Sequence, residues 1–247
     1  MDLLIIVIVG LVAGTFSGLI GGGASLFTTP ALLLLGLPPH VSVGTTRLGS
    51  TGLMFGSLLR FYKSNTIVWS LVLPFVFLSA VASIVGAYLV IYTPASILEP
   101  IIALVLVVSA PLVLVNKSFG VKQNHDINPG FFAYLGVFLS KVLQAAFGTG
   151  IGLLVNYAYI HSFGLTFNQA NAVKRISGVV MSLITLTIFF QNGIVALEEG
   201  LVLLVTMFVG GYLGSHYALK LGNLRVKYLF VGLVVIMGLM LIADNIV

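Results

Sequence analysis

Long apolar segments separated by short polar stretches fill almost the whole chain. A helix needs about 20 residues to cross a hydrocarbon core about 30 Å thick, and most of the segments are that long. The pattern predicts an all-α polytopic membrane protein with about five helical segments in each half. The segments run approximately over 3–20, 24–36, 41–61, 67–92, 97–115, 130–147, 150–163, 169–190, 194–219 and 224–246.

Segments 24–36 and 150–163 are shorter than a membrane span. They are either short tilted helices or the returning arms of re-entrant hairpins that begin at residues 3 and 130. Glycine clusters lie at the expected tips of such hairpins. Irregular backbone at membrane depth is tolerated where it lines a cavity or is buried in protein. We therefore favour the hairpin arrangement, or a broken helix.

The series of segments repeats after the polar stretch 116–129. We interpret residues 1–115 as a first repeat, 116–129 as a linker and 130–247 as a second repeat, all within one transport domain. The interpretation rests on the span pattern together with the glycines and an arginine. A shift of 128 residues matches Gly22 with Gly150, Leu26 with Leu154, Gly36 with Gly164, Arg47 with Arg175 and Gly86 with Gly214.

Loop charge predicts the orientation, because cytoplasmic loops carry an excess of lysine and arginine. Basic residues near 60–63, in 116–129 and at 220–227 place those loops inside, whereas 93–98 and 191–199 contain none. Both termini are then outside. Each half crosses an odd number of times, so the two repeats are expected to be inverted.

Composition supports the membrane interpretation. The 247 residues are 59% hydrophobic and 7% charged, whereas soluble domains carry about 25% charged residues. The net charge of +5 is spread over loops and does not form a nucleic-acid patch. With no cysteine there is no thiolate metal site, and no motif for a cofactor or a nucleophile–base pair is present. The first apolar segment lacks a basic region before it and is expected to be retained.

Two arginines, Arg47 and Arg175, lie near the middle of predicted spans. Arg47 is 13 residues before Arg60, ~20 Å along a helix. Ionisable groups at that depth mark candidate functional sites, and guanidinium binds oxyanions bidentately. The alternative is that each arginine is bonded to backbone carbonyls or reaches toward an interface.

Other residues near the arginines complete a candidate anion site. Lys141 is also deep and needs a partner or an anion, whereas Lys174, next to Arg175, either faces the cavity or pairs elsewhere. The glycine tips precede expected helix starts, where exposed amides bind anions, although glycine runs equally serve helix packing. Gly210, Gly211 and Gly214 are assigned to packing. The candidate substrate-binding residues are Ser42, Thr45, Thr46, Arg47, Gly22, Gly23, Ser25, Lys141, Gln144, Gly150, Asn156, Asn171, Lys174 and Arg175.

Acidic residues all fall at segment ends or in loops. A cation transporter or a carboxylate-based proton pump would place acids at depth, so their positions favour an anion. Among the histidines, which show no metal-ligand spacing, His216 is the one plausible proton carrier.

The first half carries a recognisable motif. Gly14-x-x-x-Gly18-x-x-Gly21-Gly22-Gly23, then Pro30, then residues 36–46 closely resemble the first repeat of the sulfite exporter TauE/SafE family. Residues 148–152 and 170–174 resemble its second repeat more loosely, since the proline of the usual Gly-Gly-Pro turn is absent. The resemblance covers essentially the whole chain. It implies a multi-pass protein of the prokaryotic inner or plasma membrane that moves sulfite, organosulfonates or related anions, usually outward.

These observations predict a transporter, not an enzyme, whose partners are a small anion and the lipid bilayer. Alternating access would occur at a central site lined by arginine and glycine. The alternatives are a passive anion channel, or a carrier of another small anion such as a carboxylate. Assembly into a homo-oligomer is left open.

Overall fold

The computed structural model describes residues 3–94, 96–97, 120–121, 123–124 and 127–244. Within these residues every regular element is helical, which confirms the all-α class. The predicted segment 97–115 and much of the linker 116–129 lie outside the described residues.

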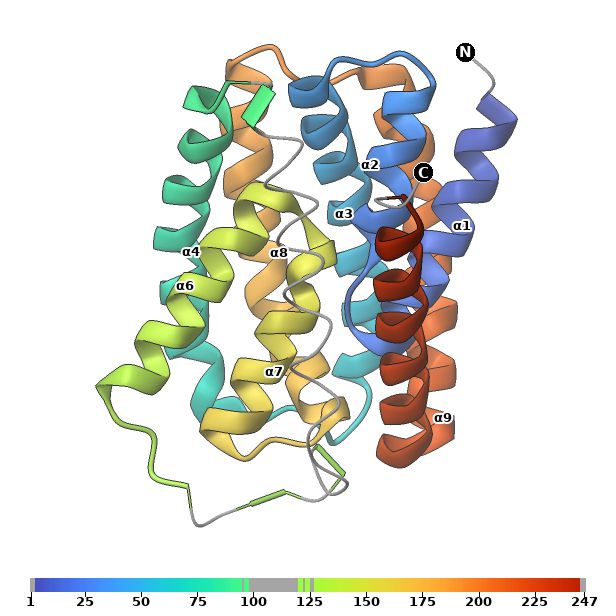
Figure 1. The fold of residues 1–247 in the computed structure, drawn as a ribbon. Coiled ribbons are helices and arrows are strands. Elements are labelled where there is room, and N and C mark those ends of the chain that lie inside the picture. Colours follow the sequence, from blue (N-terminus) through green and yellow to red (C-terminus); the bar gives the residue numbers. More distant parts are fainter. Residues whose placement is uncertain (1–2, 95, 98–119, 122, 125–126, 245–247) are drawn as a thin grey trace.

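The first half begins with a re-entrant hairpin. Helix α1 (Leu3–Ile20) runs from one end of the molecule into its middle, and α2 (Ala24–Leu34) returns to the same end (Figure 1). Helices α3 (Pro39–Tyr62) and α4 (Trp69–Tyr92) then cross the molecule in opposite directions. Segment 24–36 is thus the returning arm of a hairpin in the structure, as the favoured interpretation predicted.

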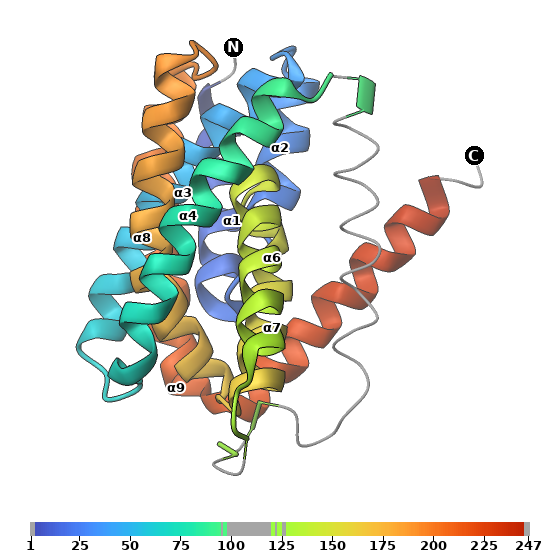
Figure 2. The same ribbon diagram turned by 90° about the vertical axis from the view of Figure 1, so that its left-hand side faces the viewer.

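The second half has the same order in the opposite direction. Helix α6 (Phe131–Phe147) enters from the other end, and the short 3₁₀ helix η2 (Thr149–Ile151) and α7 (Gly152–Phe163) turn the chain back. Helices α8 (Phe167–Gln191) and α9 (Leu197–Asp244) follow. Gly222, with φ 74°, divides α9 into two arms, and the second arm leaves the bundle at an angle (Figure 2).

Local sequence explains where several helices begin and end. Pro39 occupies the first turn of α3, where its missing N–H is no loss. Thr166 and Gln169 form a reciprocal capping box at the start of α8. Gly164 ends α7 in the left-handed conformation, with φ 66°.

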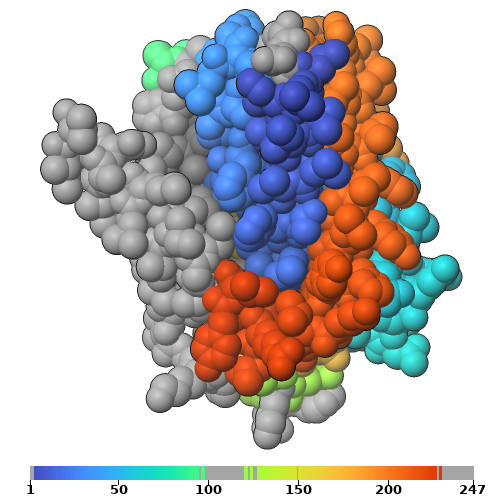
Figure 3. Space-filling view, turned by 90° about the vertical axis from the view of Figure 1, so that its right-hand side faces the viewer, coloured from blue at the N-terminus to red at the C-terminus, as the bar shows by residue number. Residues whose placement is uncertain are grey.

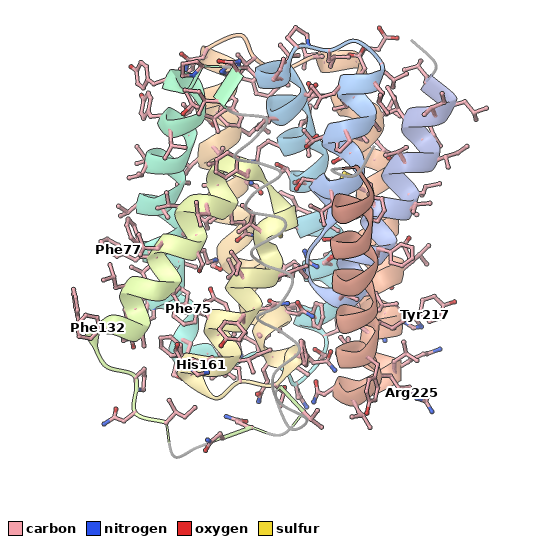
Figure 4. The ribbon with its side chains drawn as sticks, in the orientation of Figure 1. Phe75, Phe77, Phe132, His161, Tyr217 and Arg225 are labelled. Atoms are coloured by element: carbon pink, nitrogen blue, oxygen red, sulfur yellow. The ribbon has the colours of Figure 1, made fainter. Side chains whose placement is uncertain are left out.

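The outer surface is suited to lipid. Four helical stretches are long and apolar enough to span a membrane: α1, α4, α8 and Leu197–Val226 of α9. Phe77 and Phe132 point away from the bundle (Figure 4) and are largely exposed. These helices are what a multi-pass membrane protein requires. Helix α3 is instead central, and its buried face is rich in Gly, Ser and Thr.

Loops expected on one side of the membrane lie at one end of the molecule. The loop 63–68, the described residues of 120–130 and the bend between the two arms of α9 are at the end opposite to the end of α4 and the loop 192–196 (Figure 1). This grouping agrees with the predicted crossings. Which end faces the cytoplasm stays a prediction.

Small residues bring helices from different halves into close contact. A Cβ on Gly214 in α9 would lie 2.8 Å from the Leu19 nitrogen of α1, and one on Gly86 in α4 would lie 2.9 Å from the Ala146 nitrogen of α6. Figure 3 shows α1 seated directly against α9. The 128-residue shift matches Gly86 with Gly214 and carries α1 onto α6. These paired contacts are what inverted repeats would produce, and the repeat relation itself remains our interpretation.

Candidate functional site

The tips of the two hairpins meet in the middle of the bundle. Gly21 and Gly23 have φ 89° and 99°, and Gly148 has φ 87°, values that side-chain-bearing residues rarely adopt. A Cβ on Gly22 would lie 2.8 Å from the Leu153 nitrogen and 3.0 Å from the carbonyl carbon of Gly152. Backbone therefore packs on backbone at the tips, which supports the packing alternative for Gly22.

Ser25 connects the tips through its hydroxyl group. Its Oγ donates to the Phe147 carbonyl at 3.2 Å and accepts from the Gly150 nitrogen at 2.6 Å. One residue of α2 thus satisfies both the end of α6 and the turn that follows it. The structure therefore brings Ser25 and Gly150, two predicted site residues, together.

Lys174 links the same two tips with its ammonium group. Its Nζ donates to the carbonyl oxygens of Gly21 and of Gly152, the latter at 2.8 Å. The side chain is completely buried. Lys174 therefore acts across the boundary between the two halves.

Two buried amides lie beside Lys174. Asn156 of α7 donates from Nδ2 to Asn171 Oδ1 of α8 at 2.9 Å, and to the Ile20 carbonyl at 3.4 Å. Asn156 Oδ1 and Asn171 Nδ2 have no hydrogen-bond partner in the described structure. Buried polar groups are rarely left unpaired, so an acceptor and a donor are available here for a ligand or water.

The two arginines make matching contacts with backbone of the opposite half. Arg47 Nη2 donates to the carbonyl oxygens of Gln144, at 2.9 Å, and of Ala145, near the end of α6. Arg175 Nη2 donates to the Ser17 carbonyl at 2.5 Å, near the end of α1. Ser17 and Ala145 are themselves related by the 128-residue shift.

These bonds agree with the alternative interpretation of the arginines, in which each is bonded to backbone carbonyls. Each is tied to backbone carbonyls at depth, and neither reaches an interface, since Arg47 is 2% exposed and Arg175 0%. The Nε of each has no partner in the described structure. The arginines therefore hold the hairpins, and the Nε–H of each stays available as a donor.

Lys141 is the fourth buried cation. Its Nζ donates to Ser177 Oγ at 2.6 Å and lies 5.5 Å from the centre of the Tyr159 ring. That ring stacks on Phe75 with centroids 4.3 Å apart. Lys141 is 0% exposed.

The described helices that carry these four residues and the hairpins contain no acid that could balance their charges. Neither 3–98 nor 127–197 contains a single Asp or Glu, so α1 to α4 and α6 to α8 supply no carboxylate. The C-terminal ends of α1 and α6 each act as about half a negative charge. They offset roughly one of the four positive charges, and the centre stays strongly electropositive.

Some predicted residues lie apart from this group. Ser42 donates to the Leu37 carbonyl at 3.2 Å, and Thr45 accepts from the Ala196 nitrogen at 3.0 Å, near the start of α9. Thr46 accepts from Thr29 at 3.3 Å. Of the predicted set, the structure gathers at the tips Gly22, Gly23, Ser25, Gly150, Asn156, Asn171 and Lys174, with Arg47, Gln144, Lys141 and Arg175 in the adjoining helical turns.

Sequence reasoning missed Ser177 and Tyr159. Both partner Lys141, and neither belongs to a motif. Ser177 lies two residues after Arg175 and three after Lys174, a spacing that could have drawn attention to it. Within the described residues, no three His, Cys, Asp or Glu side chains are grouped to hold a metal ion.

Comparison with known proteins gives a consistent result. The profile of the sulfite exporter TauE/SafE family matches residues 6–241. A probable membrane transporter protein of Sinorhizobium is 27% identical, with 94% of this chain and 89% of the relative aligned. Similar proteins with the same description occur in Haemophilus influenzae, at 27% identity over 98% of this chain and 94% of the relative, and in Bacillus subtilis, at 28% over 91% and 92%. No solved structure matched.

Proposed function

The chain belongs to the sulfite exporter TauE/SafE family, a family of membrane transporters, and on this premise we propose that it carries small anions across the cell membrane. Sulfur oxyanions, such as sulfite or an organosulfonate, are the proposed substrates. The family description names sulfite, and the charge of the centre fits an oxyanion. A small carboxylate is the alternative cargo.

One observation carries the proposal: four cations are buried at the meeting point of the hairpins, and α1 to α4 and α6 to α8 contain no carboxylate. Burying unpaired charge is costly, by several kcal/mol per ion even after relaxation. A bound anion would recover part of that cost. The unpaired Nε atoms of Arg47 and Arg175 and the unpaired amide atoms of Asn156 and Asn171 would supply its hydrogen bonds.

Alternating access is the proposed mechanism. The hairpins enter from opposite ends, and Ser25, Lys174 and the two arginines bond across their meeting point. Opening toward one side would separate one hairpin from these contacts while the other stays closed. The burial of all four cations, none of which is more than 2% exposed, favours such an occluded carrier over a continuously open channel.

Binding and flux together test the proposal. Purified protein should melt at higher temperature with sulfite, sulfate or methanesulfonate, because a ligand that binds the folded state stabilises it. In proteoliposomes, labelled anion should then enter against its gradient when unlabelled anion is trapped inside. Flux without saturation or such counterflow would identify a channel, and stabilisation by carboxylates alone would change the substrate class. Neither stabilisation nor flux with any anion would refute the function.

A further inference from the structure

Lys141 differs from the other buried cations in the chemistry of its partner. Among the described residues, the Ser177 hydroxyl, 2.6 Å away, is the one group that forms a hydrogen bond with its Nζ. A hydroxyl can either accept from an ammonium or donate to a neutral amine. When Ser177 Oγ accepts from Lys141, its own proton is donated to the Lys174 carbonyl oxygen, 3.3 Å away. The bond can therefore persist in both protonation states of Lys141.

The other three cations have no partner of this kind. Lys174 is held by two carbonyl oxygens, which accept and never donate, so among the described residues the lone pair of a neutral Lys174 would have no donor. Arg47 and Arg175 are also held by carbonyls, and guanidinium does not lose its proton in proteins. If one positive charge is to leave the site when the anion leaves, Lys141 is the residue whose hydrogen bond permits it.

The surroundings of Lys141 supply no other group to balance its charge. From α7 it faces Tyr159, and Lys174 and Arg175 are on α8 beside Ser177. Arg47 of α3 binds the carbonyl of Gln144, one turn further along α6. Helix α4, which also packs on α6, has no Asp, Glu, Lys, Arg or His. Every charged neighbour of Lys141 in the described part of the chain is therefore positive, which disfavours a protonated Lys141 in the empty site.

We propose that Lys141 couples anion transport to proton movement: its amine is neutral in the empty site and takes up one proton when an anion binds. The proposal rests on the proposed anion transport. On binding, a proton from water bonds to the Nζ lone pair, and Ser177 turns from donor to acceptor. On release of the anion the same proton returns to water, and no other bond forms or breaks. Anion and proton thus move in the same direction.

The test uses sulfate and methanesulfonate, which both stay fully ionised around neutral pH, so a proton that moves with them belongs to the protein. Wild-type protein in liposomes is given an acidic exterior, with the membrane potential held at zero. If one proton accompanies each anion, a gradient of one pH unit drives about tenfold accumulation of the anion. The liposomes are also assayed for exchange of labelled against unlabelled anion without a pH gradient.

Two substitutions separate coupling from binding. In Lys141→Arg the charge is permanent, so exchange persists at a reduced rate while the accumulation driven by pH is lost. In Lys141→Met any remaining uptake is insensitive to the pH gradient. His216→Gln is the matched control, because His216 is another titratable residue of a membrane span; it should keep the accumulation.

The outcomes distinguish the two proposals. Exchange without pH-driven accumulation in wild-type protein overturns the coupling and leaves the transport function intact. Accumulation that survives in Lys141→Arg, or that disappears in His216→Gln alone, shows that Lys141 is not the proton carrier. If neither anion is exchanged by wild-type protein and neither stabilises it, the transport proposal fails, and the coupling fails with it.

Discussion

Replacing Gly22 with alanine tests whether the hairpin tips are packed as closely as the structure places them. The added Cβ would stand 2.8 Å from the Leu153 nitrogen, 3.0 Å from the Gly152 carbonyl carbon and 3.1 Å from Leu153 Cδ2. Two of these atoms are backbone of the opposite hairpin and cannot rotate away. Gly22 has no positive φ, so the strain would come from contact and not from its own backbone conformation.

The magnitude follows from the cost of overpacking, about 1–3 kcal/mol for an added methyl group in a close-packed site. For a chain of this size, each kcal/mol lowers the melting temperature by about 2–4 °C. Gly22→Ala should therefore melt on the order of 5 °C below wild type in detergent without ligand. Anion affinity should fall as well, because the same contact positions Gly152, whose carbonyl holds Lys174.

Gly136→Ala is the matched control. Gly136 lies in α6, the first arm of the other hairpin, and a Cβ there would meet no atom of the described residues within 4 Å. Within a helix, alanine is favoured over glycine by about 1 kcal/mol, so this variant should melt at or above the wild-type temperature. A Gly22→Ala protein as stable as Gly136→Ala would refute the close contact. If it nevertheless lost anion binding, the tip amides themselves would contact the substrate.

Three further predictions concern charge, orientation and packing. Arg47→Ala and Arg175→Ala should each weaken anion binding by about 2–5 kcal/mol while the protein still inserts, with Arg→Lys recovering part; near-normal binding and transport in both alanine variants would show that the arginines serve structure alone. A cysteine at Asn192 should react with an impermeant maleimide from outside and one at Asn124 only after permeabilisation, and the reverse result would invert the orientation. Gly214→Ala should lower the melting temperature, with affinity falling only in proportion to stability; a selective loss of affinity would contradict its packing role.

The segment pattern was sufficient to predict most of the fold. It predicted the short arms 24–36 and 150–163 as the returning halves of hairpins, because their length falls below a membrane span and glycines mark the turns. It also predicted that charged side chains would lie deep in three of the segments, those that contain Arg47, Lys141 and Arg175. The length of an apolar segment and the glycines at its ends are local properties, so they can be determined from a single sequence.

Long-range partners were less predictable. The depth of Arg47 followed from its position in a span, but its bonds to Gln144 and Ala145 depend on how α3 crosses α6. Thr45 was expected near the substrate, yet its hydroxyl accepts from Ala196, because the residue faces the start of α9. Lys141 was recognised as a buried cation needing a partner, whereas Ser177 became visible only when α6 and α8 were placed together.

The carbonyl bonds of the arginines do not by themselves assign a structural role. Carbonyl oxygens satisfy hydrogen-bond donors, but they carry only partial charge, and the two helix ends offset about one of four positive charges. A purely structural clamp could be made by a neutral amide donor, without the cost of burying a charge. In this chain the donors to these carbonyls are charged: Arg47, Lys174 and Arg175. Residues 3–98 and 127–197 contain no carboxylate. This excess of positive charge in the described helices is the reason to test the arginines for a role in anion binding before assigning them to structure alone.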